Sequence, residues 1–215
     1  MNIFQSLLEN RLVENTGNRI YGVVIGIVTN NQDPEGLGRV KVKFPWLSEN
    51  NESNWARIVA PMAGNGFGVY FLPEQKDEVL VAFEQGDLRY PFILGVLWNG
   101  QDHPPEKNQD GKNNIRVIKS RSGHTVRLID EDGKEKIEII DKSSKNSITI
   151  DTANNTIKIA SDKDITLSAS QGTITLDAQQ IAIKSSKQTN VEATGKLALK
   201  ANQTLDIKGT RVNIN

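Results

Sequence analysis

The side chains that could do chemistry are few and scattered along this chain. There are two histidines, His103 beside a pair of prolines and His124 in a turn-like segment. The sequence has no cysteine, so thiolate metal ligands, a cysteine nucleophile and disulfides are excluded. The carboxylates alternate with lysine, as in Lys134-Glu-Lys136-Ile-Glu138, which is typical of a solvated strand face, and no general acid/base pair stands out. We therefore expect no enzyme activity, no metal site and no cofactor.

A glycine-rich stretch, Gly64-Asn-Gly66-Phe-Gly68, superficially resembles a phosphate-binding loop. A phosphate-binding loop requires a following Lys-Ser/Thr pair between a strand and a helix, and neither is present here. The stretch is therefore predicted to be a turn.

The charge distribution argues against nucleic-acid binding. Basic and acidic residues balance at 26 each over the whole chain. Residues 1–100 carry 8 basic and 11 acidic side chains, although Arg39, Lys41 and Lys43 line one face of an expected strand. Such a short basic stripe on a net-acidic domain is a weak signal for binding single-stranded nucleic acid. The aromatic residues are better explained as the core of the domain.

The elements that would position any site fall into two compositions. All 12 aromatic residues and all seven prolines precede residue 106, whereas the last hundred residues have only Ile, Leu, Val and Ala to bury. Before the boundary, short β-branched runs alternate with glycine and turn residues, which predicts a small closed barrel of the OB type. The expected strands are 20–29, 39–44, 55–60, 69–72, 78–84 and 91–98.

From Ser147 onward the chain repeats an apolar-polar-apolar triplet followed by turn residues. The triplets begin on average every 8 residues, and alternation at period two predicts short strands with one buried face. Such strands cannot bury that face alone, which is typical of a solenoid or an interwoven β-helix. A trimer winding about a shared axis is favoured over a single-chain solenoid, and its core is predicted to contain Ile148, Ile150, Ile157, Ile159, Ile165, Leu167, Ile174, Leu176, Ile181, Ile183, Leu205 and Ile207.

The N-terminal segment carries an apolar stripe at helical spacing, formed by Ile3, Phe4, Leu7, Leu8 and Leu12. This stripe fits either a helix packed on its own domain or a docking segment for a partner. We find no signal peptide and no membrane-spanning run. The expected organisation is a docking segment at 1–18, an OB barrel at 19–100, a linker at 101–120 and a β-helical spike at 121–215.

In this order of elements the chain resembles the spike proteins of contractile injection machines, namely phage baseplate assembly protein V and the C-terminal part of VgrG proteins. The residues that carry the resemblance are Gly36–Trp46, Trp55–Ile58, Asp77–Phe83, Gly86–Pro91, Ile93–Asn99, Ser122–Thr125 and Gly209–Asn215. The resemblance implies a homotrimer that is assembled in the cytoplasm. In it, barrels dock on a hub and intertwined rods pierce a target cell envelope when the sheath contracts.

Several family features are expected to be missing. Only residues 101–120 lie where some relatives insert a lysozyme-like domain, and about 18 residues precede the barrel where VgrG proteins carry hub domains. The hub is therefore expected to be a separate protein that binds the Ile3–Leu12 stripe. Because no histidine follows His124, the His-X-His iron site of some phage spikes is absent. A PAAR-like tip protein is instead expected on Val212, Asn213, Ile214 and Asn215.

Two other classes of function stay open from the sequence. One is an OB-fold module that binds nucleic acid or glycan, with a β-solenoid as its stalk. The other is a cell-wall enzyme. The structural spike is the preferred hypothesis.

Overall fold

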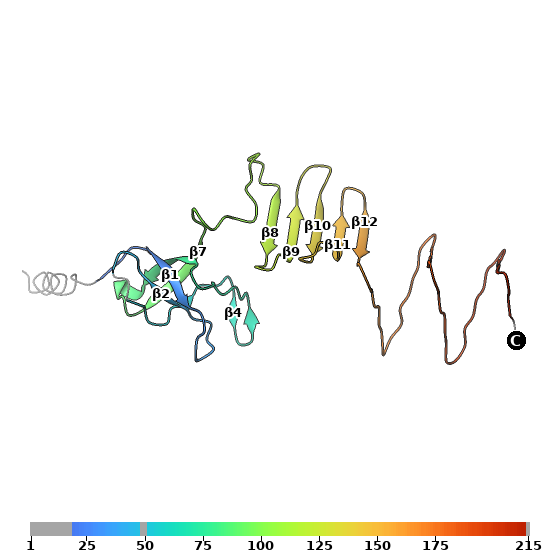
Figure 1. The fold of residues 1–215 in the computed structure, drawn as a ribbon, viewed down its shortest axis with the longest axis horizontal. Helices are drawn as coiled ribbons and strands as arrows, with labels where there is room; N and C mark the ends of the chain where they lie inside the picture. Colours follow the sequence, from blue (N-terminus) through green and yellow to red (C-terminus); the bar gives the residue numbers. More distant parts are fainter. Residues whose placement is uncertain (1–18, 48–50, 214–215) are drawn as a thin grey trace, which may run out of the picture. The chain divides into compact units, whose positions relative to one another are not determined.

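The computed structural model describes residues 19–47 and 51–213. Within these residues the only helical element is one 3-10 turn, η1 (Glu84–Gly86). The all-β prediction is thus confirmed (Figure 1). In chain order the strands are β1 (Val24–Asn30), β2 (Lys41–Lys43), β3 (Arg57–Ile58), β4 (Ala63–Gly64), β5 (Phe67–Gly68), β6 (Glu78–Phe83), β7 (Pro91–Leu97), β8 (Ile115–Lys119), β9 (Thr125–Ile129), β10 (Lys136–Ile140), β11 (Ser147–Asp151) and β12 (Thr156–Ala160).

The first sheet has the strand order β2-β1-β6-β7-β3, with β3 parallel to β7 and the other pairs antiparallel. The two edges of this sheet meet where Val40 and Ala56 exchange backbone hydrogen bonds. The Val40 N–H donates to the Ala56 carbonyl at 3.1 Å, and the Ala56 N–H donates to the Val40 carbonyl at 2.7 Å. This exchange closes the sheet into a small barrel.

Alternating side chains of these strands fill the barrel interior. The buried core consists of Val28, Val40, Val42, Phe44, Ala56, Val79, Val81, Phe83 and Ile93. Gly26 lies in the middle of β1 because a Cβ there would come within 3.1 Å of Val81 and 3.3 Å of Val42. A larger residue at this position would push the curved strands apart.

Two expectations for the barrel region need correction. Residues 69–72 form no strand; Val69, Tyr70 and Phe71 are exposed, and Leu72 is half-buried against the barrel core. By contrast, the turn predicted for the glycine-rich stretch is confirmed, since the stretch forms the tight β4–β5 hairpin with Gly66 at φ +78°. Phe44 and Phe83 are core aromatics, but Phe67, Tyr70 and Phe71 are not. The β4–β5 pair is hydrogen-bonded to no third strand, so the aromatics around it stay outside the barrel core.

The second sheet is an antiparallel meander in the order β12-β11-β10-β9-β8. Its turns are built by polar side chains. Asp141 accepts hydrogen bonds from Ser143 at 2.8 Å and from the Asn146 amide at 2.9 Å, between β10 and β11. Asp151 accepts a hydrogen bond from the Asn154 N–H at 2.9 Å, between β11 and β12. Such Asp turns return the chain beside itself.

This meander differs from the expectation that the whole of 121–215 is interwoven. The triplets at Ile148–Ile150 and Ile157–Ile159 occupy β11 and β12, which pair with each other inside one chain. The meander also begins at Ile115, within the expected linker. The tight turns at Asp141 and Asp151 explain the difference, because they hold successive strands of one chain in register.

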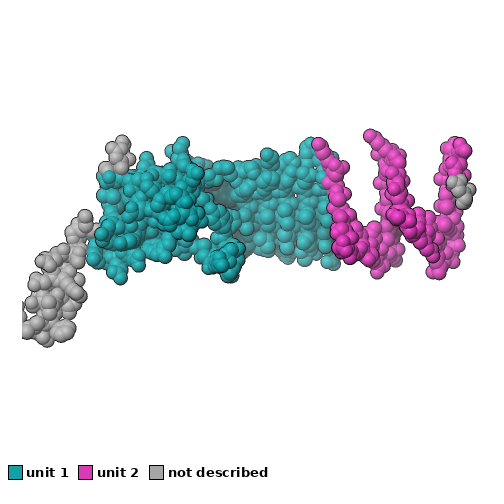
Figure 2. Space-filling model, turned by 90° about the horizontal axis from the view of Figure 1, so that it is seen from below, with its two compact units in different colours: residues 1–162 teal, residues 163–215 magenta. Residues whose placement is uncertain are grey.

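The chain divides into two compact units, residues 1–162 and 163–215 (Figure 2). In the second unit the described residues, 163–213, contain no strand. They run back and forth as extended segments joined by bends, such as the one closed by the Gly172 N–H on the Ala169 carbonyl at 3.2 Å (Figure 1). The β-helix expected for this unit therefore stays a prediction.

Candidate interaction surface

Over strands β9 to β12, one face of the meander carries only apolar side chains, which we call the apolar ladder. Strand register places Val126, Ile139, Ile148 and Ile159 in one cross-strand row. A second row contains Leu128, Ile137, Ile150 and Ile157. Because side chains opposite one another in a sheet are in contact, the eight form one continuous surface.

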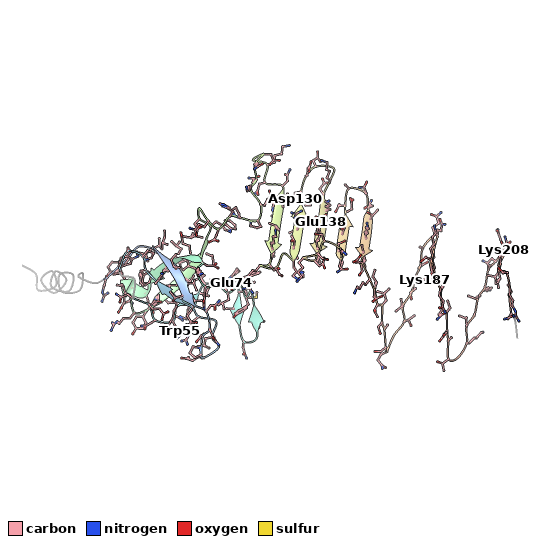
Figure 3. The ribbon with its side chains drawn as sticks, in the orientation of Figure 1. Trp55, Glu74, Asp130, Glu138, Lys187 and Lys208 are labelled. Carbon is pink, nitrogen blue, oxygen red and sulfur yellow. The ribbon has the colours of Figure 1, made fainter. Side chains whose placement is uncertain are left out.

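The apolar ladder is exposed in the single chain. The exposed fractions run from 37% for Val126 to 72% for Ile157. The opposite face is mixed: it carries Ile129 and Ile140 beside polar residues such as Glu138 (labelled in Figure 3), which pairs with Lys136 at 3.0 Å. A sheet face that is entirely apolar is normally covered. In the described residues nothing covers it.

The remaining predicted core residues lie in the second unit and are exposed as well. Each is at least half exposed, from 50% for Ile174 to 73% for Ile183. The members are Ile165, Leu167, Ile174, Leu176, Ile181, Ile183, Leu205 and Ile207. The single chain thus brings four of the twelve predicted core residues together in the ladder and leaves the other eight without a partner face in its described part.

The other predicted sites are only partly covered by the structure. The hub-binding residues Ile3, Phe4, Leu7, Leu8 and Leu12 lie outside the described residues. Of the tip-binding residues, Val212 and Asn213 are exposed, whereas Ile214 and Asn215 lie outside the described residues. Both assignments stay predictions.

Ladder members Val126, Leu128, Ile137 and Ile139 were not among the predicted core residues. Their alternation was visible in the sequence, but their spacing of eleven residues set them apart from the octad repeat. Register within the meander joins them to the octad triplets. The regular alternation of apolar and polar residues, rather than the length of the repeat, was the feature of the sequence that could have identified these ladder residues.

The basic stripe on the barrel is largely neutralised. Arg39 pairs with Asp33 at 2.8 Å, and Lys41 pairs with Glu52 at 2.8 Å. Both cations also lie near the Trp55 ring, at 6.0 and 5.5 Å from its centroid. Cations that are already paired contribute little to binding a phosphate backbone, which weakens the nucleic-acid alternative.

The histidines take no part in a shared site. His124 accepts a hydrogen bond on Nδ1 from the Lys142 backbone N–H at 3.3 Å, which links two neighbouring turns of the meander. His103 is exposed in the segment between the two sheets. Among residues 19–47 and 51–213 there is no cluster of three or more His, Cys, Asp or Glu side chains that could hold a metal ion. The same residues contain no helix long and apolar enough to cross a bilayer.

The strongest electrostatic feature of the barrel is the loop between β1 and β2. The Asp33 carboxylate accepts hydrogen bonds from Arg39 Nε and Nη2, each at 2.8 Å, and from the Leu37 backbone N–H at 3.1 Å. Hydrogen bonds from the Arg39 side chain hold the pKa of Asp33 well below its ordinary value. This carboxylate therefore shapes the loop and is not a proton donor near neutral pH.

Replacing Asp33 with asparagine is expected to lower the melting temperature of the barrel by several degrees at pH 7. A carboxyl whose pKa is lower in the folded chain stabilises the fold above its unfolded pKa of about 3.9. That stabilisation is lost as the pH falls from about 3.9 toward the folded pKa, so the difference in melting temperature between wild type and Asp33→Asn should be smaller at pH 3 than at pH 7. Thermal melts at both pH values measure this. Glu35→Gln is the control, since Glu35 is an exposed partner of the same Arg39 and should change little; equal losses from both variants would disprove the assignment.

Comparison with known proteins shows which domain family the barrel resembles. Residues 24–98 match the model of the type VI secretion system/phage-baseplate injector OB domain. The barrel is an injector OB domain. The match begins at the first residue of β1 and ends just after β7, so it covers every strand of the first sheet. The predicted OB barrel is thus confirmed.

Three relatives extend the similarity beyond the injector OB domain. The chain is 31% identical over 133 residues to the type VI secretion system spike protein VgrG4b of Pseudomonas aeruginosa, covering 55% of this chain and 16% of the relative. It is 33% identical over 102 residues to the type VI secretion system spike protein VgrG3 of Vibrio cholerae, and the alignment covers 44% of this chain and 10% of the relative. It is 31% identical over 134 residues to the spike protein VgrG1a of P. aeruginosa, and the alignment covers 54% of this chain and 20% of the relative. The chain is therefore similar to baseplate and VgrG spike proteins but spans only about a tenth to a fifth of their length.

Proposed function

We propose that this chain is a structural spike of a contractile injection machine, with three copies winding together behind their injector OB domains. The observation that carries the proposal is that the apolar ladder and, separately, the predicted core residues of the second unit from Ile165 to Ile207 are exposed in the single chain. Three chains about one axis would bury these residues together, which removes an apolar surface that a soluble monomer rarely exposes. The similarity to VgrG spike proteins supports the same function.

The backbone of the second unit favours interweaving over simple side-by-side packing. Buried backbone N–H and C=O groups are nearly always paired. The meander pairs these groups within the chain, whereas residues 164–213 form no β-strand pairing. Strands of neighbouring copies placed between successive segments would supply the missing partners. Backbone pairing along the whole axis would make the rod stiff enough to pierce an envelope.

We further propose that the chain has no catalytic activity of its own. The support is that the carboxylate of Asp33 in the barrel is already bound by the Arg39 side chain, and that the two histidines lie in separate segments. Purified protein should leave a peptidoglycan zymogram unchanged. A lysis band that stays with the protein through repurification would contradict this.

Two finer assignments follow from the resemblance. A separate hub protein would bind the N-terminal stripe Ile3–Leu12. A small PAAR-like protein would bind the segment from Gly209, where Val212 is 48% exposed and the backbone is extended and open to strand addition.

A paired pull-down from the native host tests both assignments, with proteins identified by mass spectrometry. Deleting residues 2–12 should abolish recovery of the baseplate hub and leave the tip protein bound. Deleting residues 209–215 should have the reverse effect, so each truncation is the control for the other. Unchanged recovery of the hub by the first variant, or of the tip protein by the second, would refute the corresponding assignment.

A further inference from the structure

Two asparagines of the chain, Asn65 and Asn99, are each followed by a glycine. The side-chain amide of an asparagine can be attacked at Cγ by the backbone nitrogen of the next residue. Glycine in that next position has no Cβ to block the approach, and it gives the backbone its widest range of conformations. These two positions are therefore where this attack is least hindered by the sequence, but the structure surrounds them very differently.

Asn65 lies in a turn that leaves its side chain free to react. Asn65 and Gly66 are the two central residues of the β4–β5 hairpin, between the paired residues Gly64 and Phe67. Within the part of the chain that the structure describes, the Asn65 side chain is exposed and makes no hydrogen bond. A Cβ added to Gly66 would meet nothing within 4 Å, so the space beside the attacking residue is open.

The hairpin that carries this turn is held by few contacts. Strands β4 and β5 have two residues each and, among the described residues, pair with no third strand. An isolated pair of short strands is marginally stable in water, and such segments open locally at a small cost in free energy. The backbone around Asn65 can therefore rearrange to bring the Gly66 nitrogen to the side-chain amide.

Asn99 has the same kind of neighbour, but its side chain is held in place. Its Oδ1 accepts hydrogen bonds from the backbone N–H groups of Gln101 at 2.8 Å and of Asp102 at 2.7 Å. Its Nδ2 donates to the carboxylates of Asp102 at 3.3 Å and of Glu78 at 3.4 Å. The Asn99 backbone N–H also donates to the Asp102 carbonyl at 3.0 Å, which closes the turn. Rotating this side chain for the attack would break hydrogen bonds that the side chain of Asn65 does not make.

We propose that Asn65 is a site of spontaneous deamidation, through which the folded chain gains a carboxylate on the β4–β5 hairpin. The backbone nitrogen of Gly66 bonds to Cγ of Asn65 and loses its proton, and the side-chain nitrogen leaves as ammonia, which gives a cyclic succinimide. Water then adds to one carbonyl of this ring and breaks one of its C–N bonds. The product is an aspartyl or isoaspartyl residue, and the reaction needs only water and involves no oxidation or reduction.

Deamidation would change the surface beside the hairpin. The hairpin and the segments on either side of it border a groove of about 610 Å³, and none of the residues that line this groove is charged. Gly64 and Gly66 are among those lining residues, so the reaction places a negative charge between them. The isoaspartyl product also adds one carbon to the backbone of the turn. Covering this rim in an assembly would then bury an unpaired charge, which is strongly unfavourable.

Peptide mapping by mass spectrometry tests the site in the full-length protein, incubated at mildly alkaline pH below its melting temperature. The peptide that contains Asn65 should gain the mass of an amide-to-carboxylate conversion several-fold faster than the peptide that contains Asn99. In urea, where the fold holds neither side chain, the two rates should become similar. Asn65→Gln should abolish the fast conversion, because the longer side chain closes a ring less readily. Asn99→Gln is the matched control and should leave the fast conversion unchanged.

Two results would overturn the assignment. Similar rates at Asn65 and Asn99 in the folded protein would show that the hydrogen bonds around Asn99 do not protect it. Conversion of Asn65 that is slow in the folded protein and fast in urea would show that the hairpin shields the amide. Neither result bears on the spike proposal, because the mass of the particle in solution tests that proposal separately.

Discussion

Ile165→Asp is expected to dissociate the trimer or to lower its melting temperature sharply. The substitution would place three carboxylates around one axis with no cation to compensate them. An unpaired charge in a buried position costs about 3–5 kcal/mol. Circular dichroism melts, followed by light scattering at micromolar concentration, measure the effect. The loss should be partly reversed near pH 3, where the introduced carboxyls take up protons.

Thr166→Asp is the matched control for this experiment. It introduces the same group in the same triplet, one residue along, on the face that the proposed rod turns toward solvent. In the single chain both positions are exposed, so a monomer would tolerate the two substitutions equally. Equal melting temperatures for the two variants would show that Ile165 does not lie in a shared core.

Ile93→Ala is expected to cost the injector OB domain about 2–5 kcal/mol of folding free energy, because it opens a cavity in a closed core. Ile93 is fully buried, at 0% exposure, among the valines of the barrel. All three tryptophans precede residue 106, so tryptophan fluorescence during urea unfolding reports mainly on the barrel region. The unfolding midpoint of that signal should fall clearly.

Leu47→Ala is the control for Ile93→Ala, since it removes an apolar side chain of similar size that is 43% exposed. Its midpoint should change much less. If the two variants unfolded at the same denaturant concentration, Ile93 would not be part of a packed barrel core. The rod should remain trimeric in both variants, because its proposed core lies in separate residues.

The alternation of apolar and polar residues made much of the architecture predictable. Strands β1, β6 and β7 lie within one to four residues of the expected bounds because their runs are long and end at turn residues. The all-β class followed from the same pattern. The octad triplets also marked which side chains need a partner, and all of them that are described prove to be exposed in a single chain.

The remaining features depend on contacts that a linear pattern does not record. The glycines at 64, 66 and 68 indicated a turn, but not that Phe67 would cross Gly64 and help to line a groove. The meander was missed because Asp141 and Asp151 fold the chain back on itself, which the apolar repeat alone does not distinguish from winding. The aromatic residues outside the core could not be separated from Phe44 and Phe83 by composition.

The mass of the native particle in solution tests the central claim most directly. Light scattering coupled to size exclusion, at micromolar concentration and physiological salt, should give three times the chain mass of 23.8 kDa. The mass should not fall on moderate dilution if the shared axis is a stable core. A species of 23.8 kDa would contradict the account, because the apolar ladder and the rows beyond it would then face water in the functional state.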